Sequence, residues 1–223
     1  MNPELAERFA ARPTMTGART PFYYEFPTVG VLLYDKKLHC TGTLVAPKVV
    51  LTAAHCIAGV DRGRIRFGFG QNVAIAVAHS FEIDDMQYPT GFPDARFKYD
   101  SSTYADDVGL LYLKKAPGTR MTRLATVQPS YPATLEFVGY GFDLSGHSGT
   151  RGTAFLLTTL VNPRRLKHGD AVRSVCTGDS GGPAFDRQDA VLAVTSTTTG
   201  CVGGESTLVP ALYPWLDPRV PDW

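Results

Sequence analysis

The chain has 223 residues, with 22 Lys and Arg against 21 Asp and Glu, and its formal net charge is +1. This balance, without any block of like charges, argues against a nucleic-acid binder, and no apolar run approaches the ~18 residues that cross a bilayer. We therefore expect neither nucleic acid nor a membrane among its partners. The low content of charged residues (19%) and the abundance of Gly, Pro, Val, Thr and aromatic residues indicate a mostly β protein with many turns.

A short N-terminal helix is the first predicted element, because Asn2 can cap it and Pro3 fits its first position. Short apolar or alternating runs then predict a first series of strands, at residues 29–34, 43–45, 49–52, 64–69 and 73–77. Residues 84–104 are typical of a loop, and residues 108–113 form a compact apolar strand.

A connector follows, and after it comes a second series of predicted strands, at residues 135–138, 153–160, 183–185 and 191–195. The apolar C-terminal segment 209–216 predicts a short helix, which Pro210 and Pro214 limit. Strands at this spacing predict an all-β barrel or sandwich.

Four cysteines, Cys40, Cys56, Cys176 and Cys201, allow three disulfide pairings. None lies in a C-x-x-C motif and no histidines cluster at zinc-ligand spacing, so we expect no structural metal. Two disulfides would imply an oxidising compartment, yet the polar start of the chain lacks the apolar core of a signal peptide. We therefore expect a secreted protein whose signal is absent from this chain, with a cytoplasmic protein as the alternative.

The segment Gly178-Asp179-Ser180-Gly181-Gly182 carries the strongest chemical signal. A serine between glycines suits a nucleophile on a tight turn, because a substrate carbonyl can approach the backbone there. A glycine-rich hairpin with a bystander serine is the alternative. The nucleophile elbow of α/β-hydrolases shares this pattern, but that fold needs a histidine after the serine, and no histidine follows Ser180.

A general base must therefore precede Ser180, and His55, between small residues and Cys56 at the end of a predicted strand, is the candidate. The acid pair Asp106-Asp107 enters an apolar strand, which would place one carboxylate against the interior. Because a buried Asp is rarely left unpaired, an imidazole N–H would satisfy it.

These segments resemble the chymotrypsin/trypsin-like serine proteases over residues 26–215, nearly the whole chain. Four motifs occur in the family's order: Cys40 with Thr52-Ala53-Ala54-His55-Cys56, then Asp107-Val108-Gly109-Leu110-Leu111, Gly139-Tyr140-Gly141, and Cys176 with Gly178-Asp179-Ser180-Gly181-Gly182-Pro183. The resemblance implies two perpendicular six-stranded β-barrels with a short C-terminal helix. It divides the chain into an N-terminal extension (1–25) that could serve as a propeptide, a first barrel (26–116), a connector (117–130), and a second barrel with the terminal helix (131–223).

The resemblance also implies roles for individual residues. Ser180 would attack a peptide carbonyl, His55 would take its proton, and Asp107 would orient His55. The N–H groups of Gly178 and Ser180 would form the oxyanion hole, and Ser196 would hydrogen-bond the aspartate. Cys40 would pair with Cys56 and Cys176 with Cys201. The pocket for the residue before the scissile bond would be lined by Ser174, Val175, Ser196, Thr197 and Thr198.

Several positions depart from the family. The family frees an Ile-Val-Gly-Gly terminus whose α-amine pairs with the acid before the nucleophile, here Asp179, but the equivalent segment begins at Met15 and follows Thr14. Either cleavage frees Met15 for this pair, or Asp179 is satisfied otherwise and no cleavage is needed. Residues 62–81 lack the acidic pair that binds calcium in relatives. The tryptophan that usually follows the serine after the last barrel strand is replaced by Thr197, which removes an apolar wall.

We therefore predict a serine endopeptidase with an acyl-enzyme intermediate, no cofactor and protein or peptide substrates. Two disulfides are closer to bacterial relatives than to animal digestive enzymes. Ser174 argues against a tryptic pocket, and Val175 and Thr198 narrow it as in elastases, which favours small aliphatic residues. Two alternatives stay open: a latent intracellular protease activated by a partner or by N-terminal cleavage, and an inert protease-like binding module. We expect a monomer, with a regulatory partner or inhibitor left open.

Overall fold

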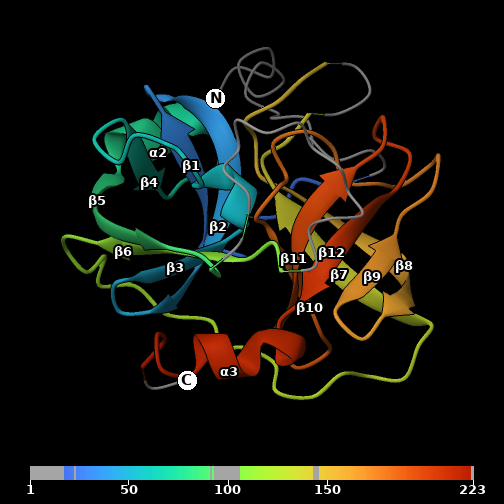
Figure 1. Cartoon of the computed structure of the whole chain (residues 1–223). Helices are drawn as coiled ribbons and strands as arrows, with labels where there is room; N and C mark the ends of the chain where they lie inside the picture. Colours follow the sequence, from blue (N-terminus) through green and yellow to red (C-terminus); the bar gives the residue numbers. More distant parts are fainter. Residues whose placement is uncertain (1–17, 23, 91, 93–105, 143–145, 222–223) are drawn as a thin grey trace, which may run out of the picture.

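In a computed structural model, the chain forms two closed antiparallel barrels (Figure 1). The structure describes residues 18–22, 24–90, 92, 106–142 and 146–221. The strand order is β1-β2-β3-β6-β5-β4 in the first barrel and β10-β11-β12-β9-β8-β7 in the second. The predicted fold class is therefore confirmed. The expected helix after Asn2, and Met15, lie outside the described residues.

The first barrel contains β1 (Val29–Tyr34), β2 (Lys37–Ala46), β3 (Val49–Thr52), β4 (Ile65–Gly68), β5 (Ser80–Gln87) and β6 (Gly109–Leu113). Its core consists of fully buried aliphatic and aromatic side chains such as Leu32, Leu51 and Phe67. Because β3 and β6 are buried at nearly every position, their sequences are nearly continuous apolar runs and do not alternate between apolar and polar residues.

The second barrel contains β7 (Ala133–Gly139), β8 (Gly152–Asn162), β9 (Arg165–His168), β10 (Pro183–Phe185), β11 (Val191–Thr198) and β12 (Gly204–Leu208). Its own core is smaller and includes Phe137, Leu166 and Leu192. Val191 and Val194 of β11 pack instead with the larger core of the first barrel. The two barrels therefore share buried apolar contacts along β11.

Short helices lie between and after the strands, and one of them occupies a segment that was predicted as a strand. The run at 73–77, predicted as a strand, is the helix α2 (Val73–Ala78), whose Asn72 side chain accepts a hydrogen bond from the Ile75 N–H at 3.0 Å. This capping bond satisfies an N-terminal N–H of the helix and outweighs the β preference of valine. Residues 84–87, predicted as loop, belong to β5.

The C-terminal segment forms a 3₁₀ turn, η2 (Pro210–Leu212), followed by the short helix α3 (Tyr213–Leu216), as predicted for residues 209–216. Leu212 and Leu216 join the core of the first barrel, although the segment follows the second barrel in the chain. Figure 1 shows α3 lying across the two barrels at one end of the molecule. No helix in the described part of the chain is long and apolar enough to span a membrane.

Candidate active site

Strand pairing brings His55 next to Asp107. Thr52, the last residue of β3, pairs with Gly109, the first residue of β6, so these antiparallel strands end and begin at the same edge. His55 follows three residues later in the 3₁₀ turn η1 (Ala54–Cys56), and Asp107 precedes β6 by two residues. The His55 Nδ1 lies 2.7 Å from Asp107 Oδ2, and the His55 backbone N–H donates to Asp107 Oδ1 at 2.9 Å.

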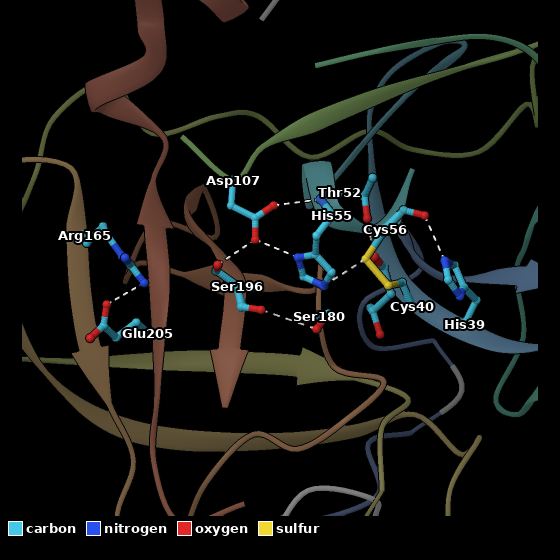
Figure 2. A network of polar contacts seen from close by, with 11 residues as sticks. His39, Cys40, Thr52, His55, Cys56, Asp107, Arg165, Ser180, Ser196 and Glu205 are labelled. Carbon is cyan, nitrogen blue, oxygen red and sulfur yellow. Dashed lines mark hydrogen bonds and ion pairs between the residues drawn. A yellow bond between two sulfur atoms is a disulfide. The ribbon is translucent and has the colours of Figure 1, made fainter. Parts of the chain in front are cut away.

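The Asp107 carboxylate is completely buried and accepts a third hydrogen bond, from the Ser196 hydroxyl at 2.6 Å (Figure 2). Burial disfavours its ionised form, but the adjacent His55 ring and the hydrogen bonds from His55 and Ser196 outweigh burial, so the pKa of Asp107 lies below its ordinary value. The carboxylate is therefore charged near neutral pH and fixes the orientation of the imidazole ring.

The register of β11 explains why Ser196 can reach Asp107. The pairing of β11 with β12 shifts between Thr195 and Thr197, which leaves Ser196 outside the regular ladder. Its hydroxyl donates to Asp107, while its backbone carbonyl lies 3.5 Å from the Ser180 hydroxyl. Figure 2 draws Ser180 on the side of the His55 ring that carries Nε2, and this nitrogen lies 3.6 Å from Cys56 Sγ.

Ser180 is held by the first barrel, although it belongs to the second. The Thr41 N–H donates to the Ser180 carbonyl at 2.8 Å, and the Thr41 hydroxyl donates to the Gly178 carbonyl at 2.9 Å. Gly181 lies so close to β2 and β3 that a Cβ there would be 2.1 Å from Thr52 Oγ1, and its φ is +80°. Only glycine fits this position, which explains the residue after the nucleophile.

The N–H groups of Gly178 and Ser180 are both available to a ligand. Neither donates to an acceptor in the part of the chain that the structure describes. Their neighbours are satisfied within the loop, since the Asp179 N–H donates to the Cys176 carbonyl and the Gly182 N–H to the Asp179 carbonyl. An unoccupied pair of N–H groups beside the serine is what an oxyanion-binding site requires.

Asp179 is buried beneath this loop. Its two carboxylate oxygens accept the N–H groups of Gly141 and Cys176, each at 2.8 Å. Burial raises the pKa of Asp179 to about 7, although these two hydrogen bonds oppose the rise. A Cβ on Gly139 would lie 2.2 Å from this carboxylate, which explains the glycine there. Among the described residues no cation pairs with Asp179, and Met15, its expected partner, lies outside them.

The residues assigned to the substrate pocket lie on segments that the structure joins together. Ser174 and Val175 are fully buried, and the Ser174 hydroxyl donates to the Val175 carbonyl at 3.0 Å. The Thr198 hydroxyl lies 3.0 Å from the Val175 carbonyl and 3.2 Å from the Gly203 carbonyl. Thr198 therefore links the two segments that the sequence analysis placed around the pocket, and Thr197 precedes it with an intermediate exposure.

Both disulfides of the structure join segments next to these residues. Cys40 bonds to Cys56, which follows His55, and Cys176 bonds to Cys201, with Cα–Cα distances of 6.2 and 4.5 Å. Cys40, His55 and Cys56 lie close enough together to suggest a metal site. Because the two sulfurs are bonded to each other, the thiolates that would hold a metal are absent.

Two features of the site lie beyond the sequence analysis. The first is the docking of the nucleophile loop onto Thr41 and Thr52, which sequence does not signal because strand threonines are common. The second is an ion pair between Arg165 Nη2 and Glu205 Oε2 at 2.6 Å, on strands β9 and β12 (Figure 2). Neither strand was predicted, because both are short and rich in polar residues.

Comparison with known proteins agrees with this geometry. The family model described as Trypsin matches residues 15–216. Chymotrypsin from Phaedon cochleariae is 28% identical over 201 residues, which cover 79% of this chain and 70% of that protein. The vitellin-degrading protease of Bombyx mori is 24% identical over 81% of this chain and 76% of its own length.

Solved structures show the same fold at lower identity. Human heparin binding protein superposes with a TM-score of 0.76 at 20% identity, covering 92% of this chain and 96% of that one. Neuropsin from mouse brain gives 0.75 at 17% identity, with 90% and 97% coverage. The match of the family model over nearly the whole chain, together with these relatives, shows that the protein belongs to the trypsin family and is a serine protease.

Proposed function

We propose that this protease cleaves peptide bonds through Ser180, His55 and Asp107. The observation that carries the proposal is the continuous set of contacts from the buried Asp107 carboxylate to His55 Nδ1 and, through Ser196, to the Ser180 hydroxyl. The charged Asp107 holds the His55 proton on Nδ1, which leaves Nε2 to accept the proton of Ser180.

The reaction follows the order that this arrangement permits. Ser180 Oγ attacks the substrate carbonyl while His55 Nε2 takes its proton, and the negative charge on the carbonyl oxygen is received by the N–H groups of Gly178 and Ser180. His55 then gives the proton to the leaving amine, and an acyl-enzyme on Ser180 remains. Water attacks the acyl group by the same proton transfer and restores the free serine. Each oxyanion donor contributes about 3–4 kcal/mol to the lowering of the barrier.

The proposed specificity is for small aliphatic residues before the scissile bond. Two contacts support it: the Thr198 hydroxyl ties the opposite segments together through the carbonyls of Val175 and Gly203, at 3.0 and 3.2 Å. An aromatic ring would have to separate these segments, and overpacking of this kind costs about 1–3 kcal/mol. That corresponds to roughly a 5- to 150-fold preference for Ala, Val or Thr over Phe.

A second candidate function is a latent protease, and the state of Asp179 favours it. A buried carboxyl with a pKa near 7 needs a cation to remain charged under the nucleophile loop. Cleavage after Thr14 would create such a cation at the α-amine of Met15. In the alternative, the two backbone N–H groups alone hold Asp179 and the uncleaved chain is active.

We propose that the protein is a secreted monomer that acts on proteins or peptides. The two disulfides support an oxidising compartment. Several relatives are snake venom proteases by name, such as gussurobin of Gloydius ussuriensis. An N-terminal sequence of the protein isolated from its source, together with its disulfide state, tests this proposal.

Labelling with a fluorophosphonate tests the proposed function directly. We expect one adduct per chain, at Ser180, with no adduct in Ser180→Ala and a strong loss of labelling rate in His55→Ala. The full chain and a chain that begins at Met15 are labelled in parallel, so that latency appears as labelling of the shorter chain alone. No adduct in either form would overturn the catalytic proposal and favour an inert binding module.

A further inference from the structure

A hollow lies beside the residues that follow Ser196. It has a volume of about 540 Å³ and is lined by Thr197–Thr199, Val202–Glu205 and Lys167. Thr197 follows directly after the serine that contacts both Asp107 and Ser180. The hollow also shares Thr197 and Thr198 with the proposed pocket for the residue before the scissile bond, so it lies next to that pocket. Its use as a substrate subsite rests on the proposed function, in which Thr198 borders the pocket for the residue before the scissile bond.

The wall of this hollow is polar and charged. Glu205 pairs with Thr197 across β11 and β12, and with Lys167 across β12 and β9. Its carboxylate forms the 2.6 Å ion pair with Arg165, whose side chain is only 6% exposed. The short Thr197 side chain stands where the family usually has a tryptophan, so these charges border the hollow rather than lie behind a large ring.

The charges of the wall do not cancel. Glu205 is neutralised by the buried Arg165, and the neighbouring Arg164 forms its own ion pair with Asp106. Lys167 is exposed and lines the hollow, and within the described residues its ammonium forms no ion pair. One positive charge is therefore left over, on a flexible side chain next to the hydroxyls of Thr197 and Thr199.

We propose that this hollow is a subsite for an acidic side chain of the substrate, three or four residues before the scissile bond, and that Lys167 determines the preference. The Lys167 ammonium attracts the substrate carboxylate, while the threonine hydroxyls donate hydrogen bonds to it. A lysine or arginine of the substrate is repelled by Lys167, and Glu205 cannot compensate because Arg165 already occupies it.

Peptide kinetics test the proposal with the full chain in its active form. Three fluorogenic peptides carry Glu, Gln or Lys at the third position before the scissile bond and are otherwise identical, and a second set varies the fourth position. In one of the two sets we expect kcat/KM to be two- to fivefold higher for Glu than for Gln at low salt, and lowest for Lys. The difference shrinks toward onefold at 1 M NaCl because salt screens an exposed pair.

Charge reversal identifies the residue responsible. Lys167→Glu is expected to invert the order, so that the Lys peptide becomes the best substrate. Lys115→Glu, which makes the same change of charge at an exposed lysine that follows β6, leaves the order intact. Equal rates for the three peptides in both sets, or a preference for Glu that Lys167→Glu does not alter, overturns the proposal.

A binding measurement separates this inference from the catalytic proposal. Fluorescently labelled versions of the same peptides are titrated with Ser180→Ala protein, with and without the Lys167→Glu change, and the anisotropy gives the Kd. The same order of affinities supports the subsite even if Ser180 forms no adduct with a fluorophosphonate. If Ser180 is labelled but the Kd values do not depend on the charge of the peptide, the subsite is wrong and the proposed function stands.

Discussion

The buried Asp179 carboxyl makes the stability of the chain depend on pH, and the dependence can be calculated. Its pKa rises from an ordinary value of 3.8 to about 7 in the folded state. Between these values the folded protein holds a proton that the unfolded chain has released, so the free energy of unfolding falls as the pH rises from about 4 to about 7. The loss amounts to about 4 kcal/mol and is complete above pH 7.

Asp179→Asn isolates this contribution, because asparagine has nearly the same shape and does not titrate. One of the N–H groups of Gly141 and Cys176 loses its acceptor in the variant, which lowers stability by about 1–3 kcal/mol at every pH. Urea unfolding at pH 4.5, 5.5, 6.5 and 7.5 gives the free energy of unfolding of both proteins. We expect the wild type to lose several kcal/mol more than the variant across this range, whereas parallel pH profiles would refute the reasoning.

The same assay tests whether the Met15 α-amine pairs with Asp179. In a chain that begins at Met15, an ammonium group beside the carboxylate lowers its folded pKa, so the loss of stability between pH 4 and 7 should disappear. Acetylation of that amine is the control, and it should restore the slope. A slope that is identical in the full, shortened and acetylated chains would show that Asp179 is held without the N-terminus.

Three further results are expected. Ser180→Ala and His55→Ala should each abolish turnover, and the double variant should be no slower, since the two residues act as a unit; a much slower double variant in single-turnover kinetics would contradict this. Thr198→Gly removes the link to the Val175 carbonyl and should raise kcat/KM for Phe relative to Ala at least fivefold, so an unchanged ratio argues against the narrow pocket. Glu205→Gln leaves the Arg165 guanidinium, only 6% exposed, with a weakened counter-charge, and should lower the free energy of unfolding by about 1–3 kcal/mol in urea titrations, while no loss would show that the pair is not stabilising.

The parts of the fold that sequence predicts are those where burial dominates. Strands such as β1 and β6 carry unbroken apolar runs, and the motif around His55 lies at the end of another such run. The short strand β9, by contrast, reads Arg-Leu-Lys-His, and no local pattern shows that Arg165 is buried. Its burial depends on the ion pair with Glu205, which lies 40 residues further along the chain. A local sequence pattern therefore cannot predict this strand.

The candidate site shows the same division. Residue identities and order suggest that His55, Asp107 and Ser180 work together, because the chemistry needs a base, an acid and a nucleophile. The way in which Thr41 holds the Ser180 loop could not be predicted, since it depends on contacts between residues about 140 positions apart. The sequence predicts a strand where α2 forms because valines favour strands, whereas the Asn72 side chain caps the helix by accepting the Ile75 N–H.

The attachment of the nucleophile loop to β2 has a consequence for how the enzyme loses activity. Because the Thr41 N–H and hydroxyl hold the Ser180 and Gly178 carbonyls, the serine keeps its position only while the two barrels are in contact. His55 and Asp107 stay with the first barrel when the contact is broken, and Ser180 leaves with the second. Partial denaturation that separates the barrels should therefore inactivate the enzyme before either barrel loses its strands. For the same reason, either barrel produced alone should be inactive.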